Sequence, residues 1–152
     1  MKNRFLALSL ALSLTACATV PSGAPSYSRA ANPPSPNANV YIYRIGAYPT
    51  LRTPTVTIDG KAIFDPPEKS YTFVTLAPGS HEFKIDWSWD TGWPDLAFPL
   101  VVEPSVPIYI KISGSFTPNG THYTAGSVAR AVQQPVAEQE LSSCCRYVPH
   151  RP

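Results

Sequence analysis

Three tryptophans within seven residues are the strongest candidates for ligand chemistry in this sequence: Trp87, Trp89 and Trp93. They are interleaved with aspartates, of which Asp90 lies between the second and the third indole. Indole rings stack on the apolar faces of sugars while carboxylates bind hydroxyl groups, and such mixed linings are typical of ligand sites. One interpretation of the segment is therefore a glycan-binding platform.

A structural interpretation of the same segment is simpler, and we favour it. Phe83, Ile85 and Trp87 alternate with charged residues, which is the period-two pattern of a strand with one buried face. Trp87 then belongs to the core, while Trp89 and Trp93 cap the edge of the domain. The aspartates lack the alternating spacing of a loop that wraps a calcium ion, so we expect no metal site there.

The adjacent pair Cys144 and Cys145 is the second feature with chemistry of its own. In an exported chain the oxidising compartment favours a disulfide. Adjacent Cα atoms, however, lie about 3.8 Å apart, below the usual range of about 4.4 to 6.8 Å, so a bond between them would be strained and easily reduced. The pair is then either a redox switch or link to another chain, or, as we favour, one small apolar residue facing inward and one near the surface.

No catalytic constellation occurs in the sequence. It lacks a Gly-x-Ser-x-Gly elbow, a His-Glu-x-x-His motif, a P-loop and a dinucleotide fingerprint. The histidines, His81, His122 and His150, do not have the spacing of metal ligands, and His81 begins a strand after a turn. We therefore expect no enzyme, no metal site and no cofactor.

The N-terminus is typical of an exported protein. A basic start precedes an apolar run at 5–16, which as a helix would rise only about 18 Å, short of the roughly 30 Å hydrocarbon core. Residues 1–16 are therefore predicted to be a signal peptide rather than a membrane span. The run ends in Leu-Thr-Ala-Cys at Cys17, which resembles the lipobox of bacterial lipoproteins, where the cysteine is lipidated and becomes the new N-terminus.

The lipobox resemblance implies where the chain is found. Cys17 would anchor it in a membrane, and Ala18, which stands where an Asp retains such proteins on the inner membrane of enteric bacteria, implies the outer membrane, facing the periplasm. Five prolines and four serines at 18–37 occur without apolar periodicity. Residues 17–37 are therefore predicted to be the lipidated cysteine and a flexible linker.

Composition and charge restrict the domain count and the partners. The chain has 152 residues, 43% of them apolar and 14% charged, which is ordinary for one globular domain. Cleavage removes Lys2 and Arg4, and the ten remaining basic residues are balanced by ten acidic ones. A neutral chain has no basic patch to neutralise phosphates, so we expect no nucleic acid partner.

The stretch around which the domain is organised, 55–87, is predicted to form four short strands with three turns. Asp59-Gly60 suits a two-residue type I′ hairpin, and Pro78-Gly79 suits a type II turn. Further strands are predicted at 39–45, 96–103, 107–114 and 123–132, the first with two faces that can be buried. About seven or eight strands in residues 38–133 predict an all-β fold, a small antiparallel two-sheet sandwich.

The last part of the chain, 134–152, is predicted to be a short helix and a tail. Pro135 suits a first helical position, and one helical face carries Ala137, Leu141, Cys144 and Cys145. A helix this short needs docking, so we expect it to pack on the sandwich, with 150–152 frayed.

Four segments together resemble a known family: VYIYR, VTIDGKAI, YTFVTLAPGSHEFKI and AEQELSSCCRYV. They are similar, over residues 39–148, to bacterial lipoproteins that carry domain of unknown function 2846. IDGK followed by LAPGSHEFKI is also similar to PEGA-type and other prealbumin-like sandwich domains. The resemblance implies an envelope lipoprotein with a small β-sandwich and no catalytic residues, and the segment WSWDTGWPD departs from its pattern.

The sequence thus predicts a membrane-anchored envelope lipoprotein whose domain is a non-catalytic structural or interaction module. Its expected partners are the membrane and an envelope protein or glycan. The alternative is a glycan-binding module that uses the tryptophan segment, with Trp87, Trp89, Trp93 and Asp90 as ligand-binding residues.

Overall fold

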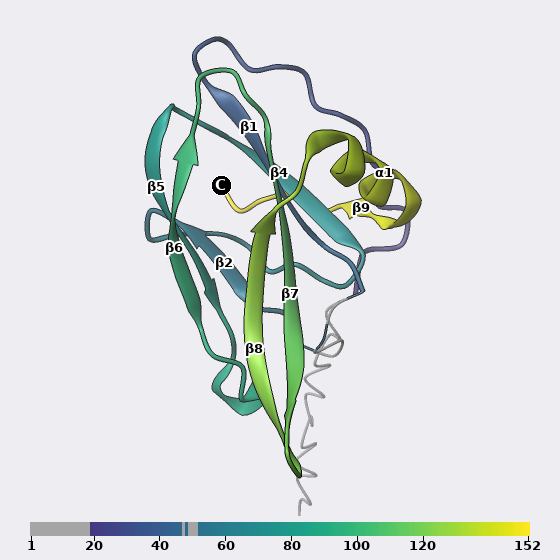
Figure 1. Cartoon of the computed structure of the whole chain (residues 1–152). Coiled ribbons are helices and arrows are strands. Elements are labelled where there is room, and N and C mark those ends of the chain that lie inside the picture. Colours follow the sequence, from purple (N-terminus) through teal and green to yellow (C-terminus); the bar gives the residue numbers. More distant parts are fainter. Residues whose placement is uncertain (1–18, 47, 49–51) are drawn as a thin grey trace, which may run out of the picture.

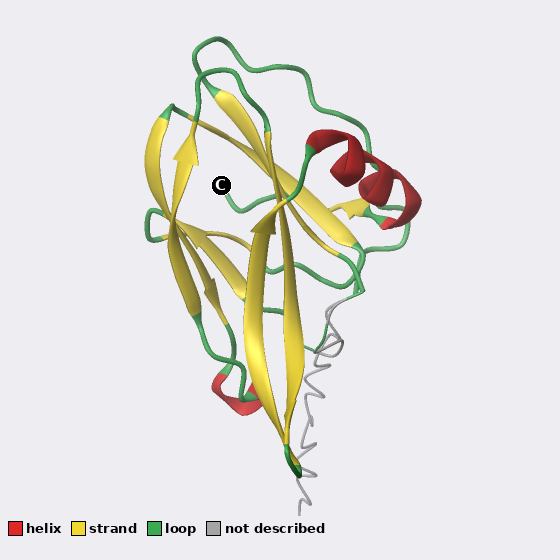
Figure 2. Ribbon diagram, viewed as in Figure 1, coloured by secondary structure: helices red, strands yellow, loops and turns green. Residues whose placement is uncertain are grey.

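The computed structural model describes residues 19–46, 48 and 52–152; the predicted signal peptide and Cys17 lie outside the described residues. The described part forms nine strands in two sheets, with one α-helix on the outside (Figure 1). Strands account for most of the regular structure, and the helices are short (Figure 2). The predicted small all-β sandwich with a C-terminal helix is confirmed.

The larger sheet contains five strands in the order β8, β7, β1, β4, β9. Their bounds are β1 Ala38–Arg44, β4 Ser70–Leu76, β7 Ile108–Asn119, β8 His122–Ala131 and β9 Arg146–Tyr147. The pairing is mostly antiparallel, as predicted, but β1 pairs with β7, and β4 with β9, in parallel. Parallel neighbours require a crossover, and between β1 and β7 the chain forms β4 as well as the four strands of the other sheet.

The smaller sheet contains four strands in the order β3, β2, β5, β6. Their bounds are β2 Thr55–Ile58, β3 Lys61–Phe64, β5 Gly79–Asp86 and β6 Leu96–Val102. The β2–β3 hairpin has positive φ at both turn residues, 52° at Asp59 and 75° at Gly60. The predicted type I′ chemistry is therefore confirmed at this turn.

The Pro78-Gly79 segment is a corner between the sheets and not a type II turn. It connects β4, which pairs with β1, to β5, which pairs with β2. Gly79 has a φ of 139°, far from the roughly 80° of a type II turn. The glycine is still needed, because the corner requires a positive φ that other residues rarely adopt.

The core between the sheets is built from the faces that the alternating pattern predicted. Each facing strand contributes apolar side chains that are almost completely removed from water. Burying a side chain of this size contributes roughly 1.5 to 3 kcal/mol, so these residues dominate the stability of the fold. They are Val40, Ile42, Val56, Ile58, Phe83, Ile85, Ile110 and Ile112.

The outer face of the larger sheet is covered by α1, Gln134–Cys144. Ala137 and Leu141 of the helix are fully buried against Tyr41 and Tyr43 of β1. The predicted docking of the helix is confirmed, and so is the expectation that β1 buries both of its faces.

The β7–β8 hairpin is longer than predicted. The strand expected at 107–114 continues to Asn119, and the chain turns at Gly120, whose φ is 61°. β1 ends at Arg44, which pairs with Ile112, and Tyr48 bridges to Gly114; in the described part of the chain, the residues of β7 after Gly114 pair only with β8. The hairpin therefore extends beyond the five-stranded part of the sheet, toward the lower tip in Figure 1.

The flexible linker predicted for 17–37 is wrong for its second half, which packs on the domain. Tyr27 joins the aromatic cluster beneath α1, with its ring centroid 5.3 Å from that of Tyr71. The backbone N–H of Ala30 donates to the Tyr41 hydroxyl at 3.0 Å. Composition predicted a linker here, but one tyrosine and a row of backbone hydrogen bonds are enough to hold the segment.

The C-terminal tail is also held, although it was expected to be frayed at 150–152. The backbone N–H of Arg151 donates to the carbonyl oxygen of Ile63 at 2.6 Å, and its guanidinium pairs with Asp65. Both partners lie on or next to β3, whose edge the tail covers.

Candidate functional site

The three tryptophans do not share one surface. Trp87 closes the core at the end of β5 with only 8% of its area exposed, as the structural interpretation predicted. Trp93 is half-buried, with its ring centroid 6.1 Å from that of Trp87. Trp89, in the short 3-10 helix η1, Trp89–Thr91, is 95% exposed. Only Trp89 of the predicted platform is open to a ligand.

The aspartates of this segment hold the loop together. Asp90 forms an ion pair with Arg52, with oxygen and nitrogen 2.9 Å apart. The Asp95 carboxylate accepts a hydrogen bond from the backbone N–H of Trp87 at 2.9 Å. These contacts occupy the carboxylates that the glycan-binding interpretation would use for sugar hydroxyls, and they fix the loop that carries Trp89.

A buried arginine lies beside Trp87 inside the domain. The Arg44 side chain is fully buried and donates to the backbone carbonyl oxygens of Arg52, at 2.8 Å, and Pro66, at 3.1 Å. Its guanidinium lies 5.5 Å from the Trp87 ring centroid and 3.7 Å from the Glu68 carboxylate. Burial lowers the pKa of Arg44, and Glu68 opposes that shift. The sequence analysis missed this role, although Arg44 follows Val40 and Ile42 on the core face.

Exposed aromatic rings gather where the hairpin leaves the sandwich. Phe116 of β7 and Tyr123 of β8 point to the same side of the hairpin, with ring centroids 6.3 Å apart. Trp93 packs edge-on against Phe116, with ring centroids 4.7 Å apart, and the ring centroid of Tyr48 lies 5.5 Å from that of Phe116. We call the exposed rings of Tyr48, Trp89, Phe116 and Tyr123 the aromatic end; Phe116 remains 48% exposed and Tyr123 72%.

The aromatic end exists because the two sheets differ in length. Phe116 and Tyr123 continue the inward face of Ile110 and Ile112, but the facing sheet ends before it reaches them. Trp93, on the loop that follows β5, packs against the hairpin at Phe116. The core face thus continues into solvent at this end of the molecule.

Gly114 makes the packing of Trp93 possible. A Cβ at this position would collide with the indole nitrogen of Trp93 and with the carbonyl oxygen of Tyr48. The backbone N–H of Gly114 also donates to that carbonyl, at 2.8 Å. Sequence reasoning ended a strand at this glycine, yet a glycine inside a strand pattern is a known signal of close approach by another group.

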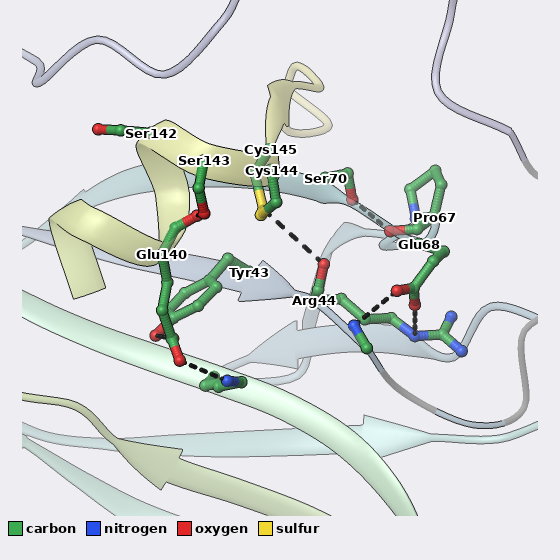
Figure 3. The surroundings of a disulfide bond; sticks show 12 residues. Tyr43, Arg44, Pro67, Glu68, Ser70, Glu140, Ser142, Ser143, Cys144 and Cys145 are labelled. Atoms are coloured by element: carbon green, nitrogen blue, oxygen red, sulfur yellow. Dashed lines mark hydrogen bonds and ion pairs between the residues drawn. A yellow bond between two sulfur atoms is a disulfide. The ribbon is translucent and has the colours of Figure 1, made fainter. Parts of the chain in front are cut away.

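Cys144 and Cys145 are joined in a disulfide, with Cα atoms 3.7 Å apart. The favoured interpretation of two separate side chains is therefore wrong in its bonding, although Cys145 is buried and Cys144 is partly exposed, as expected. Figure 3 shows the Cys145 sulfur directed at the carbonyl oxygen of Arg44, 4.0 Å away. A disulfide sulfur carries no proton, so this approach is a packing contact.

The residues after the disulfide join three parts of the chain. The backbone N–H groups of Arg146 and Val148 donate to the carbonyl oxygens of Lys69 and Tyr71, at 3.0 and 2.8 Å. Between them, Tyr147 donates to Pro25 of the N-terminal segment at 2.8 Å. The cysteine pair therefore ends α1 at the point where β9 bridges β4 and the N-terminal segment.

The tyrosines under α1 form a hydrogen-bonded layer. Tyr43 donates to Glu140 at 2.6 Å, and Tyr109 donates to Glu138 at 2.8 Å. Burial, reinforced by these carboxylates, raises the pKa of both tyrosines. Burial by itself would raise the pKa of Glu140, but the hydrogen bonds from Lys111 and Tyr43 outweigh it and lower that pKa. This layer binds the helix to the sheet.

The described residues contain no group of three or more His, Cys, Asp or Glu side chains placed to hold a metal ion. None of the helices in the described part of the chain has the length and apolar character to span a membrane. Comparison of the chain with family models, with curated proteins and with solved structures finds no match.

Proposed function

We propose that this chain is a membrane-anchored envelope lipoprotein, lipidated at Cys17, whose sandwich domain is a non-catalytic structural or interaction module. The anchor is supported by the lipobox at 14–17 after a short apolar run. A multiply acylated cysteine would hold the chain essentially permanently, because each buried methylene contributes about 0.8 kcal/mol. The proposal places the domain on the periplasmic side of the outer membrane.

One observation carries the interaction role, namely the aromatic end. Exposed aromatic clusters on small domains mark contact surfaces, and here the Phe116 ring packs against Trp93, which Gly114 accommodates. The carboxylates described above serve ion pairs and hydrogen bonds that support the fold. This use of the polar groups favours a binding module over an enzyme. The resemblance to lipoproteins with domain of unknown function 2846 is part of the same proposal.

A glycan-binding module is the second candidate, on the single observation that the Trp89 indole is 95% exposed. One open indole offers stacking surface for a sugar ring. This candidate predicts that the intact chain is retained on purified envelope glycan and that Trp89→Ala abolishes retention. Absence of retention of the intact chain would eliminate it.

Two measurements test the main proposal. Cys17→Ala should move the protein from the membrane fraction to the soluble fraction, and a variant that still sediments with membranes would contradict the anchor. A photo-crosslinking residue at Tyr123 should give defined adducts in intact envelopes. The control is the same residue at Val136 of α1, which is also exposed but lies on another face of the molecule. Equal adducts from both positions would reject the aromatic end as the contact surface.

A further inference from the structure

The N-terminal segment is fastened to the domain from Pro25 onward. The backbone N–H of Tyr147 donates to the carbonyl oxygen of Pro25 at 2.8 Å. The Arg146 guanidinium donates to the Ser26 hydroxyl at 2.6 Å. The part of the chain that can separate the domain from Cys17 is therefore only the part before Pro25.

This short connection limits how far the domain can stand from a membrane that holds Cys17. Eight residue steps lie between Cys17 and Pro25. An extended chain spans at most about 3.5 Å per residue, so the reach is about 28 Å. A free linker of twenty residues would reach about 60 Å in polyproline geometry. Docking of the segment removes about half of that distance.

The register of the larger sheet relates the attachment point to the aromatic end. Successive strand pairs put five residues side by side in one row across the sheet. They are Ser26, Arg146, Ser70, Arg44 and Ile112. From that row β7 continues over 113–119, which is about 24 Å at roughly 3.4 Å per residue. A reach of about 28 Å is thus long enough for the tip of the hairpin to meet the bilayer surface in which the anchor is inserted.

The chemistry of the aromatic end selects among possible partners. Trp89 and Tyr123 carry amphipathic rings, the kind of side chain that is enriched where hydrocarbon meets headgroups. No Asp, Glu, Lys or Arg occurs at 112–129, and Asp90, beside Trp89, is neutralised by Arg52. A surface of aromatic rings and hydroxyls without net charge matches a zwitterionic lipid interface.

From these observations we infer that the aromatic end rests in the headgroup interface of the same bilayer that holds the lipid anchor. The inference depends on the proposed lipidation of Cys17, and it names the partner of the surface identified above. The fastened N-terminal segment keeps the domain within reach, and burial of the rings in the interface orients it. The β7–β8 hairpin then points toward the membrane, and α1 lies farther from it.

Fluorescence quenching tests the inference. The mature lipidated protein, purified from membranes, is reconstituted into phosphatidylcholine vesicles with and without a headgroup-nitroxide lipid. The Trp89 contribution is obtained by subtracting the emission of a Trp89→Phe variant. We expect nitroxide lipid to quench Trp89 strongly, and equally at low and high salt because the surface is uncharged. Trp89 emission that is the same with and without nitroxide lipid would overturn the inference.

Variants separate contact by the aromatic end from mere proximity to the membrane. Combined Phe116→Ser and Tyr123→Ser should reduce the quenching of Trp89, since the remaining rings bury less area. Val136→Ser, which removes an exposed apolar side chain on α1, should leave it unchanged. Equal quenching in both variants would reject docking by these rings.

The failure of this inference is distinguishable from the failure of the proposed function. Loss of anchoring is seen by fractionation, since an unlipidated chain would be absent from membranes altogether. A protein that sediments with membranes while its Trp89 remains unquenched would refute only the bilayer contact. Retention on envelope glycan, or a dimer, that is lost in Tyr123→Ser together with unquenched Trp89 would assign the aromatic end to that partner instead.

Discussion

The indole nitrogen of Trp93 lies so close to Gly114 that a Cβ on residue 114 would collide with it, so that the two residues are matched across the end of the sandwich. Through this pair the loop after β5 is pressed against β7, and the Phe116 ring is held at 4.7 Å from Trp93. The aromatic end thus depends on the absence of one side chain.

We predict that Gly114→Ala destabilises the fold by about 1 to 3 kcal/mol, the usual cost of overpacking. The obstacles are backbone and a packed indole, neither of which can rotate away. Gly126→Ala is the matched control, because its Cβ would meet only the hydroxyl of Ser115, which is the movable end of a side chain. Urea unfolding of both variants checks the difference, and similar midpoints would contradict the fitted packing of Trp93.

The buried and exposed tryptophans should differ sharply in their contribution to stability. Trp87→Ala is expected to cost about 3 to 5 kcal/mol, as for a large buried aromatic, whereas Trp89→Ala should change stability by less than about 0.5 kcal/mol. Trp93→Ala should lie between them, because its ring is partly buried against the core. Chemical denaturation measures the free energy of unfolding of all three variants. A large loss of stability in Trp89→Ala would contradict the exposed position of its indole.

Trp87→Phe provides an internal comparison for that series. The indole N–H of Trp87 has no hydrogen-bond partner among the described residues, so phenylalanine removes volume but no hydrogen bond. We expect it to cost clearly less than the alanine variant. Equal losses of stability in the two variants would indicate that the part of the indole that phenylalanine lacks provides the stabilisation.

His81 should make stability depend on pH near neutrality. Its ring nitrogens lie 2.7 Å from an Asp59 carboxylate oxygen and 2.9 Å from the carbonyl oxygen of Ala77. Both partners are acceptors, so the doubly protonated ring satisfies both, and the hydrogen bond to Asp59, followed by that to Ala77, raises the pKa of His81.

The sign of the effect follows from linkage. A raised pKa stabilises the fold fully below the unfolded value of about 6.5, and the stabilisation is lost as the pH rises through the folded value. The stability gap between the natural chain and His81→Gln should therefore be larger at about pH 6 than at about pH 9. Asp59→Asn, which keeps the turn geometry, should weaken the dependence and leave the smaller part that comes from Ala77, and an unchanged gap across this range would contradict the pairing.

The hydrogen bond from His81 also lowers the pKa of Asp59, and the backbone N–H of Glu82 adds to the shift. That contribution is present above the usual carboxyl pKa of about 3.9 and is lost only as the pH falls through the lowered value. It therefore lies outside the range in which His81 is tested.

The cysteine pair should be oxidised within one chain. Denatured protein should react with a maleimide at Cys144 and Cys145 only after reduction, and non-reducing gels should show no dimer that depends on them. Changing both to Ser should cost only about 1 kcal/mol, because a bridge between adjacent residues closes almost no loop. Labelling without reduction would refute the disulfide.

The sequence by itself determined the elements and their faces. The alternation of apolar and polar residues predicted that Val40 and Phe83 lie in the core. Asp59-Gly60 predicted a hairpin. The spacing of Ala137 and Leu141 predicted the docked helix. These features are local, because an alternating pattern of buried residues, or a turn that needs a positive φ, can be recognised from a few neighbouring residues. The candidate site was predicted only in part, since Trp87 was assigned to the core but the half-buried Trp93 was not distinguished from the exposed Trp89.

Only the tertiary structure decided which elements meet. The sheet change at Gly79, the parallel pairing of β1 with β7 and the docking of Tyr27 leave no local signature. Each depends on contacts between residues far apart in the chain, such as Tyr27 with Tyr71 and Ile42 with Ile110. The aromatic end arises in the same way, because β7 extends beyond the ends of β1 and of the facing sheet. The sequence of the hairpin does not show where those neighbouring strands end.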